Sequence, residues 1–369
     1  MPESRLHELS KQGQSVWVDS VSRAWLRDGT LARLMDEDAV VGVTSNPTIF
    51  QKALAEGDAY DEQMRELLRK EDDPKEIFFA LAADDIRDAC DLLRGVWERT
   101  RGLDGYVSLE VEPGLAYDTE RTIEQAQRFH DWVDRPNLYV KIPGTAPGLP
   151  AIEEMIARGK NINVTLIFGL GRYAEVFEAY LRGVERLIEA GGDPSTVNSV
   201  ASFFVSRVDT EADKRLEAIG GEALALRGRL AIANAKLAYE HYNGVVASGR
   251  WQRLEAQGAR RQRCLWASTS TKNPEYRDTL YVEELIGPET VNTMPLETIR
   301  AFQDHGVIER TLDRNVEDAH HVLEQLARVG VDYDDVIDTL EREGVEKFAQ
   351  SFDELLDGVR AKRGELAAA

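Results

Sequence analysis

Lys141 is the residue whose surroundings most clearly favour chemistry. It stands in the segment 138–143, which reads LYVKIP, and the apolar residues around the lysine predict a buried strand. An ammonium group buried without a partner is energetically costly, so a lysine in such a strand needs a reason. One reason is nucleophilic catalysis, because burial lowers the pKa of a lysine and favours its neutral amine. The alternative is a lysine near a strand end that extends its charged group to water.

Polar residues recur near the C-terminal ends of the other predicted strands. They include two carboxylates, and the others carry hydroxyl, amide or guanidinium groups: Asp19, Thr44, Asn46, Glu110, Asn163, Thr165, Ser202, Arg207, Ser268 and Ser270. Because side chains alternate across a strand, Thr44 shares a face with Asn46, and Asn163 shares a face with Thr165. Taken singly, Asp19 and Asn46 are also compatible with helix N-caps. A buried Glu110 needs a partner, which Lys141 provides from the next strand.

The elements that carry these residues alternate regularly between strands and helices. Eight short apolar segments predict strands at residues 16–21, 40–45, 106–111, 138–142, 162–168, 197–205, 264–269 and 290–294. Helical patterns separate the strands, which indicates a parallel sheet, and eight such units predict a closed (β/α)8 TIM barrel. We expect extra helices after the second strand, within 60–101, and a helical tail at about 296–369. No linker interrupts the chain, so we expect one domain over residues 1–369.

Composition limits the partners and the compartment. The formal net charge of −21 argues against nucleic acid, and no apolar stretch is long enough to span a membrane. The six histidines show no metal-ligand spacing, so we expect no metal and no other cofactor. Cys90 and Cys264 are too few and too far apart for a disulfide framework, and the first residues lack a signal-peptide pattern. We therefore expect a cytoplasmic protein.

A lysine, two carboxylates and no metal or nucleotide motif indicate imine chemistry. A neutral Lys141 amine would attack a ketone and form a Schiff base, which stabilises breakage of the adjacent C–C bond. Glu110, with Thr165 and a water, would shuttle protons, and Asp19 would remove a hydroxyl proton. Substrate hydroxyls would be bound by Thr44, Asn46, Asn163 and Ser202. An anionic end group would be held by Arg207, Ser268, Ser270 and Lys272, because arginine suits a phosphate.

Four motifs resemble those of the transaldolase family, in the order in which that family carries them. They are VTSNP at 43–47, YVKIP at 139–143, NVTLIF at 163–168 and SFFVSR at 202–207, and Asp19 and Glu110 fall where the family has its catalytic acids. The resemblance runs from about residue 15 to residue 294, and the long helical tail is similar to that of the longer bacterial members.

The resemblance implies a class I aldolase-type barrel of the pentose phosphate pathway. Its substrates would be sugar phosphates: a dihydroxyacetone unit moves from sedoheptulose 7-phosphate or fructose 6-phosphate to glyceraldehyde 3-phosphate or erythrose 4-phosphate. Lys141 would then be the Schiff-base lysine, Asp19 the acid/base of cleavage, and Glu110 with Thr165 the water-positioning pair. In one respect the chain departs from the shorter members, because Ser270 stands where they have an arginine. Lys272 is a candidate to replace that charge.

Two other functions fit the same residues. One is an aldolase of the fructose 6-phosphate type that releases free dihydroxyacetone to water. The other is a non-catalytic barrel that binds a sugar phosphate, because a fold by itself does not determine function. For the quaternary structure we expect a monomer or a homodimer.

Overall fold

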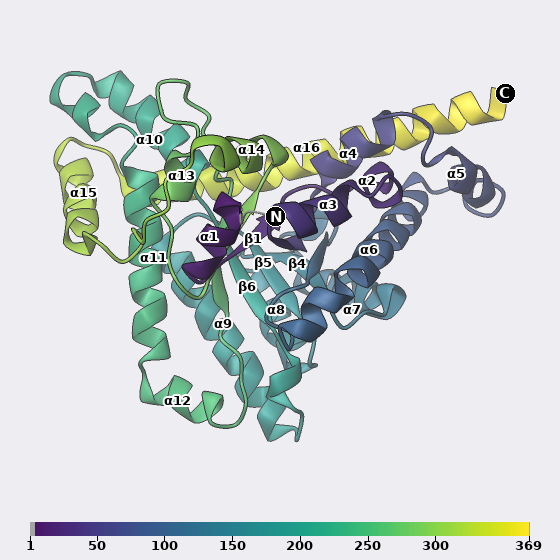
Figure 1. Cartoon of the computed structure of the whole chain (residues 1–369), viewed down its shortest axis with the longest axis horizontal. Helices are drawn as coiled ribbons and strands as arrows, with labels where there is room; N and C mark the ends of the chain where they lie inside the picture. Colours follow the sequence, from purple (N-terminus) through teal and green to yellow (C-terminus); the bar gives the residue numbers. More distant parts are fainter. Residues whose placement is uncertain (1–3, 369) are drawn as a thin grey trace.

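Eight parallel strands close into a barrel in the computed structural model, which describes residues 4–368. The strands follow one another around the barrel in chain order, each paired with its sequence neighbours, and β8 pairs with β1. Figure 1 shows the strands at the centre of the molecule with helices around them. The predicted (β/α)8 fold is therefore confirmed. The strands are β1 Gln14–Val18, β2 Val40–Val43, β3 Val107–Glu110, β4 Leu138–Pro143, β5 Ile162–Ile167, β6 Ser199–Phe204, β7 Arg263–Ala267 and β8 Thr290–Met294.

Helices connect the strands and surround the barrel. They are α1 Arg5–Lys11, α2 Arg23–Arg27, α3 Thr30–Glu37, α4 Pro47–Ala55, α5 Asp61–Leu67, α6 Pro74–Arg99, α7 Thr119–Val133, α8 Gly148–Ala157, α9 Leu170–Glu189, α10 Ser206–Ile219, α11 Leu230–Val246, α12 Gly249–Glu255, α13 Leu280–Glu283, α14 Leu296–His305, α15 Val316–Arg328 and α16 Tyr333–Ala368. Short 3₁₀ turns lie at η1 Pro113–Leu115, η2 Pro194–Thr196 and η3 Gly221–Leu226. Within the described residues, no helix is both long enough and apolar enough to cross a bilayer.

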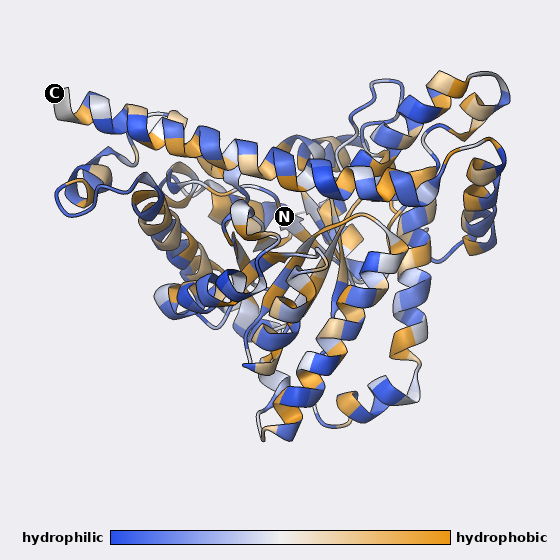
Figure 2. Cartoon of the chain, turned by 180° about the vertical axis from the view of Figure 1, so that it is seen from behind, coloured by the Kyte–Doolittle hydropathy of each residue, from blue (hydrophilic) through white to orange (hydrophobic). Residues whose placement is uncertain are grey.

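Extra helices lie in both of the predicted regions: α5 and α6 fall within 60–101, and α14, α15 and α16 follow β8. α4 also stands between β2 and β3, before the predicted region begins. The single-domain organisation of residues 1–369 stays a prediction. The sequence does not predict the path of α16. This helix of 36 residues runs across the top of the view in Figure 1, and it contacts α10, β5, α4, α5 and α6. Hydrophobic and hydrophilic residues interchange along it in Figure 2, as in a helix with one buried face.

Strand register places the chemistry-bearing residues in one row. Glu110 on β3 is the register partner of Lys141 on β4, and Lys141 is the partner of Asn163 on β5. Register partners in a parallel sheet point to the same side, so these three side chains share one layer. In β3 and β4 that layer lies toward the C-terminal ends, where barrels of this kind carry their active sites, whereas Asn163 is the second residue of β5.

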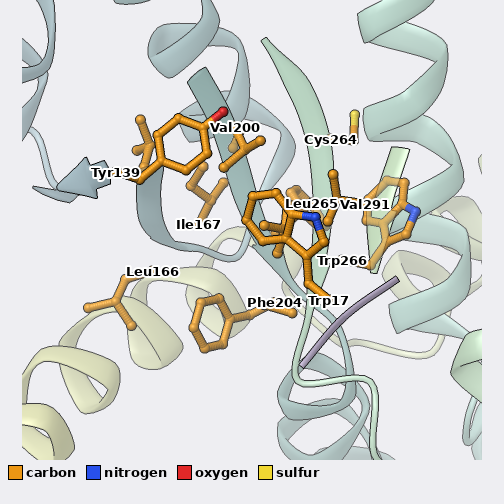
Figure 3. Packing of buried hydrophobic residues seen from close by; sticks show 14 of the residues in the cluster. Trp17, Tyr139, Leu166, Ile167, Val200, Phe204, Cys264, Leu265, Trp266 and Val291 are labelled. Atoms are coloured by element: carbon orange, nitrogen blue, oxygen red, sulfur yellow. The ribbon is translucent and has the colours of Figure 1, made fainter. Parts of the chain in front are cut away.

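Large aromatic residues fill the barrel interior, where the rings of Trp17 and Tyr139 lie 6.0 Å apart, and also the space between the barrel and its helices, where Trp266 packs on Phe203. Trp17, Tyr139 and Trp266 are completely buried, and Figure 3 shows them among aliphatic side chains of neighbouring strands. Gly42 on β2 makes room for Trp17, since a Cβ atom at this position would lie 2.4 Å from the indole ring. A larger residue at position 42 would displace the tryptophan, because buried atoms are already close-packed.

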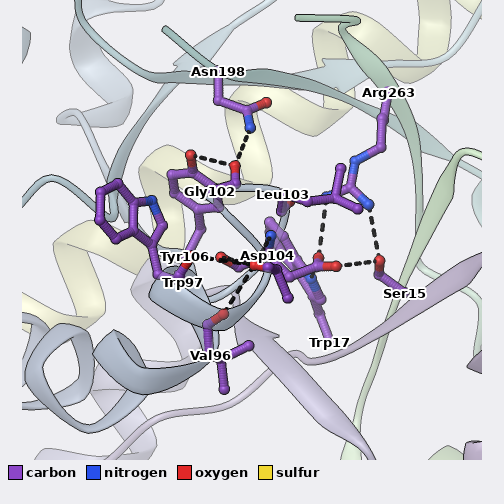
Figure 4. A network of polar contacts seen from close by, with 11 residues as sticks. Ser15, Trp17, Val96, Trp97, Gly102, Leu103, Asp104, Tyr106, Asn198 and Arg263 are labelled. Atoms are coloured by element: carbon purple, nitrogen blue, oxygen red, sulfur yellow. Dashed lines mark hydrogen bonds and ion pairs between the residues drawn. The ribbon is translucent and has the colours of Figure 1, made fainter. Parts of the chain in front are cut away.

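A polar network lies at the opposite end of the barrel from the predicted site. The Arg263 guanidinium donates to Ser15 Oγ over 2.8 Å and to Asp104 Oδ1 over 3.1 Å, as Figure 4 shows. Trp17 Nε1 donates to the same Asp104 oxygen over 3.0 Å. Ser15 and Arg263 stand at the N-terminal ends of β1 and β7. The charged groups are paired and buried there, which indicates a structural role at this end.

Candidate active site

A cavity of about 310 Å³ opens at the C-terminal end of the barrel. All the predicted site residues line it except Glu110 and Asn163. Several of the others lie just beyond the strands to which the sequence assigns them: Asp19 follows β1, Thr44 and Asn46 follow β2, and Ser268 follows β7. The cavity wall is therefore formed partly by residues that follow the strands and partly by residues within them, such as Lys141 on β4 and Thr165 on β5.

Lys141 is buried in β4 and forms an ion pair. Its Nζ lies 2.9 Å from Glu110 Oε2 and also donates to the carbonyl oxygen of Ser45 over 3.0 Å. Only 5% of Lys141 is exposed, so the alternative of a lysine that extends to water does not hold. Burial raises the pKa of Glu110, and the charge and hydrogen bond of Lys141 oppose that rise. A carboxylate with a raised pKa beside an amine is suited to exchanging protons with it.

Asp19 is held by a chain of hydroxyl groups. Thr44 Oγ1 donates to Asp19 Oδ1 over 2.7 Å, and Thr293 Oγ1 lies 2.6 Å from Thr44 Oγ1. Thr44 has one hydroxyl proton, so Thr293 donates to Thr44 and Thr44 to Asp19. Burial raises the pKa of Asp19, while the Thr44 hydrogen bond and the charges of Lys141 and Arg207 lower it. The carboxylate is thus oriented by Thr44, and its pKa stays raised because burial outweighs the groups that favour its charged form.

Thr165 and Asn163 have different surroundings, although both lie on β5. Thr165 Oγ1 is buried against the cavity and has no hydrogen-bond partner among the described residues. Asn163 is completely buried; its Nδ2 donates to Ser108 Oγ over 3.1 Å, and its Oδ1 accepts from Ser202 Oγ over 2.7 Å. Both ends of the Asn163 amide therefore contact protein. Direct substrate binding by Asn163 stays a prediction, and the contacts that the structure shows orient Ser202, which does line the cavity.

Asn46 combines the two interpretations that the sequence leaves open. Its Oδ1 accepts from the backbone N–H of Ile49 over 3.0 Å, so it is the N-cap of α4. It also lines the cavity. Its amide nitrogen has no protein partner in the described part of the chain and is available as a donor to a ligand.

Arg207 provides an unpaired positive charge. It lies at the start of α10, with its guanidinium 5.1 Å from the ring of Phe204 and 5.7 Å from the ring of Phe348. Its Nη1 is buried without a hydrogen-bond partner, and none of the described carboxylates forms an ion pair with it. Burial lowers the pKa of Arg207, whereas Asp19 and Glu110 raise it. A guanidinium whose donors are unsatisfied is suited to binding an anion such as a phosphate.

The loop after β7 lies beside Arg207. Ser268 has a left-handed backbone, with φ of 55°, and its hydroxyl lies 2.9 Å from Ser206 Oγ. Lys272 is exposed at the cavity rim, and its Nζ donates to Ser270 Oγ over 2.7 Å. The four residues predicted to bind phosphate are thus brought to one cavity, although their role as phosphate ligands stays a prediction.

Sequence reasoning missed several residues that line the cavity: Lys52, Thr293, Glu297 and Phe348. A signal for Thr293 was present, because this threonine is a polar residue near the C-terminal end of the eighth predicted strand. Lys52 lies on α4 and Phe348 on α16. Nothing in their local sequence distinguishes them from ordinary helix residues, so only the packing of these helices reveals them.

The comparisons with known proteins show the family of this chain. Residues 16–359 match the family described as transaldolase/fructose-6-phosphate aldolase. The chain is 55% identical to the transaldolase of Frankia alni over 361 residues, which covers 97% of each chain. It is also 55% identical to the transaldolase of Mycolicibacterium paratuberculosis, over 362 residues and 97% of each chain. The transaldolase of Thermobifida fusca is 55% identical over 358 residues, 96% of this chain and 97% of the relative. By this family match and by sequence similarity over nearly its whole length, the chain belongs to the transaldolase/fructose-6-phosphate aldolase family.

Proposed function

We propose that this enzyme transfers a dihydroxyacetone unit between sugar phosphates in the pentose phosphate pathway. The donor is sedoheptulose 7-phosphate or fructose 6-phosphate, and the acceptor is glyceraldehyde 3-phosphate or erythrose 4-phosphate. Relatives named transaldolase, which align with nearly the whole chain, support this reaction over simple aldol cleavage. The observation that carries the mechanism is the buried pair of Lys141 Nζ and Glu110 Oε2, 2.9 Å apart beside the cavity.

In the first half of the reaction the neutral amine of Lys141 attacks the ketone carbon of the donor. The resulting carbinolamine loses water and becomes an iminium ion, with Glu110 supplying and accepting protons through a water held near Thr165. Asp19 then removes the proton of a donor hydroxyl group, the one on the carbon that becomes the aldehyde carbon. The C–C bond cleaves, the aldehyde leaves, and the iminium takes the electron pair to become an enamine.

In the second half the enamine carbon attacks the aldehyde carbon of the acceptor. Asp19 returns its proton to the new alkoxide, and the iminium is hydrolysed, which frees the product ketose and the Lys141 amine. Asn46, Thr44 and Ser202 are the candidates to hold substrate hydroxyls, with Asn163 orienting Ser202. Arg207, Ser268, Ser270 and Lys272 are the candidates to hold the phosphate, and the unsatisfied guanidinium of Arg207 supports its part in this.

The decisive experiment traps the Schiff base. The enzyme is treated with fructose 6-phosphate and borohydride, and the intact protein and its peptides are weighed by mass spectrometry. We expect a reduced dihydroxyacetone adduct on the peptide that carries Lys141 and none in Lys141→Ala. Lys236 on α11 is a matched internal control, because it is also buried but lies outside the cavity. Its amine donates to the carbonyl oxygen of Arg314 over 3.1 Å.

Each other result contradicts a definite part of the proposal. An adduct on Lys52 or Lys272 would move the nucleophile elsewhere in the same cavity. An intact hexose phosphate on Lys141 would support the imine and contradict cleavage. No adduct, with ligand bound, would contradict the Schiff-base mechanism altogether. Transfer is then tested by the appearance of sedoheptulose 7-phosphate when erythrose 4-phosphate is added.

We also propose that the enzyme works in the cytoplasm. Cys90 and Cys264 are both free and buried, which supports a reducing compartment, because structural disulfides are rare there. Detection of the activity in the cytoplasmic fraction of the source cells, and not in secreted material, tests this. The monomeric or homodimeric state stays a prediction, which sedimentation of the purified enzyme measures.

A further inference from the structure

The long C-terminal helix brings one aromatic ring into the cavity. Phe348 on α16 is only 7% exposed and lines the same cavity as Lys141. The centre of its ring lies 6.0 Å from Lys141 Nζ and 5.7 Å from the Arg207 guanidinium carbon. The ring therefore lies beside both cations in the cavity wall, and the helix that carries it packs on α4 and α10, which follow β2 and β6 at this end of the barrel.

Contacts on both sides of Phe348 hold α16 in place. At the start of the helix, the hydroxyl of Tyr333 donates to Asn234 Oδ1 over 2.6 Å and accepts from the backbone N–H of Leu170 over 3.0 Å. One turn after Phe348, Thr48 on α4 donates to Ser351 Oγ over 3.0 Å. The phenyl ring is thus fixed by the helix that carries it.

Further along α16, Phe352 packs against the rings of Phe78 and Phe79 on α6, with ring centres 5.8 and 5.9 Å apart. Phe352 is buried like Phe348, but it does not line the cavity that contains Lys141. These two phenylalanines are one helical turn apart, so they provide a matched pair of one ring that faces the amine and one that does not.

Water access decides the fate of the enamine in the proposed reaction. After the first aldehyde leaves, the enamine either attacks an acceptor aldehyde or is protonated on carbon and returns to the iminium. Water then adds to the iminium carbon, the C–N bond breaks, and free dihydroxyacetone and the Lys141 amine result. Transfer therefore needs a site from which water is excluded until the acceptor arrives.

We propose that Phe348 is a specificity-determining residue, which shields the Lys141 imine from water and so favours transfer over release of dihydroxyacetone. This inference rests on the proposed function. It assigns to the C-terminal helix a part in the reaction, because α16 adds a second aromatic ring to the cavity, beside Phe204 of β6, and this ring is the one that lies 6.0 Å from Lys141 Nζ.

The test compares release with transfer in the full-length enzyme. Fructose 6-phosphate is the donor; free dihydroxyacetone is measured without an acceptor, and transfer is measured with erythrose 4-phosphate. We expect the ratio of release to transfer to rise by about tenfold in Phe348→Ala, because water then reaches the imine. Phe348→Leu, which keeps a branched apolar side chain, is expected to lie between Phe348→Ala and wild type. In Phe352→Leu the ratio is expected to stay at the wild-type value.

A second measurement follows the imine directly. The enzyme is loaded with fructose 6-phosphate, separated from excess substrate and quenched with borohydride at increasing times. The dihydroxyacetone adduct on Lys141 is expected to disappear several-fold faster in the Phe348 variants than in wild type or in Phe352→Leu. Circular dichroism and urea unfolding identify the variants that are folded, and if Phe348→Ala does not fold, Phe348→Leu carries the test.

The results that would contradict the role of Phe348 differ from those that would contradict the proposed function. A ratio and an adduct lifetime that do not change in a folded Phe348 variant would overturn the inference, and so would an equal change in Phe352→Leu. Both rates falling together at a constant ratio would indicate a merely structural role and would also overturn it. Failure of the proposed function appears instead in the wild type, as release without an acceptor that is as fast as transfer, or as no adduct on Lys141.

Discussion

Thr44 donates its hydroxyl proton to Asp19 Oδ1 over 2.7 Å, and Thr293 completes the chain with a contact of 2.6 Å to Thr44. The two threonines come from segments that are far apart in sequence, after β2 and on β8. Together they orient a carboxylate whose pKa is raised by burial and lowered by the Thr44 hydrogen bond. The position and the charge of the proposed base therefore depend on a neutral neighbour.

Thr44→Val is expected to move the acidic limb of the pH–rate profile to higher pH. The change removes a hydrogen bond that lowers the pKa of Asp19, so the carboxylate takes up its proton at a higher pH than in wild type. Because Asp19 acts as a base only when it is charged, kcat/KM for fructose 6-phosphate should begin to fall at a higher pH than in wild type as the solution is made more acidic. Thr44→Ser keeps the donor and is expected to keep the wild-type profile. An acidic limb that stays in place in Thr44→Val would show that another group controls it.

Asp19→Asn is expected to slow C–C cleavage while imine formation continues. A positioned base contributes roughly 10²- to 10⁴-fold to a rate, and asparagine cannot accept the proton. Borohydride trapping with fructose 6-phosphate should then collect the intact hexose phosphate on Lys141, in place of the dihydroxyacetone adduct. A turnover rate within a few-fold of wild type would remove Asp19 from this role.

Glu110→Gln is expected to affect the opposite step. Glu110 lies 2.9 Å from Lys141 Nζ, and its proton exchange is proposed to serve the formation and loss of water at the imine. The variant should therefore form little adduct of either kind within the time that wild type needs for complete trapping. Rapid quenching with borohydride measures this rate. An adduct that forms at the wild-type rate would show that Glu110 only balances the charge of the lysine.

Arg207→Gln is expected to raise KM for fructose 6-phosphate by about 10- to 100-fold, because a hydrogen bond to a charged group contributes roughly 1.5–3 kcal/mol. Activity with unphosphorylated fructose as the donor should change little, since that sugar has no anion to bind. Lys272→Gln is the comparison, and its effect on KM should be smaller because Lys272 is exposed to water. Equal loss with both donors would place Arg207 at the reacting carbons instead of at the phosphate.

Asp209 on α10 is expected to make folding stability depend on pH. It is buried and accepts from Tyr281 Oη over 2.8 Å and from the N–H of Ala231 over 2.7 Å, and burial raises its pKa to about 7. When the pKa of a carboxyl group is higher in the folded state than in the unfolded state, the group stabilises the fold at low pH. This stabilisation is fully present when the pH is below the pKa of the unfolded chain, about 3.9 for aspartate. This stabilisation is lost as the pH rises toward about 7.

Urea unfolding of wild type and Asp209→Asn at several pH values measures this effect. Relative to the variant, which has no carboxyl group here, wild type should lose up to roughly 4 kcal/mol between about pH 4 and pH 7, with each pKa unit worth about 1.4 kcal/mol. Parallel stability curves for the two proteins would contradict the raised pKa.

Much of the fold and the site follows from local pattern. Short apolar segments separated by amphipathic ones predict the eight strands, and the closed barrel follows from their number and spacing. Lys141 and Glu110 are recognisable because each is a charged residue within an apolar strand. A buried charge requires a partner, and this requirement alone predicts the pair that the structure shows.

Local sequence pattern predicts less where one residue has two roles. Asn46 is both an N-cap and a wall of the cavity, and the sequence left those interpretations open. Asn163 carries the right chemistry for a ligand of substrate hydroxyls, yet both ends of its amide contact Ser108 and Ser202. The hydrogen-bond partners of a buried amide come from other strands, so they depend on register and not on the neighbours in sequence.

By itself, then, the sequence determined the barrel, the reacting lysine and its two carboxylates, because strand period and the cost of burying charge are local properties. Only the tertiary structure decided that α16 crosses the open end of the barrel and brings Phe348 to 6.0 Å from Lys141 Nζ. These two residues are separated by more than half of the chain. The apolar stripe of α16 shows that the helix must pack against something, but the surface it covers is decided by the shape of the assembled barrel.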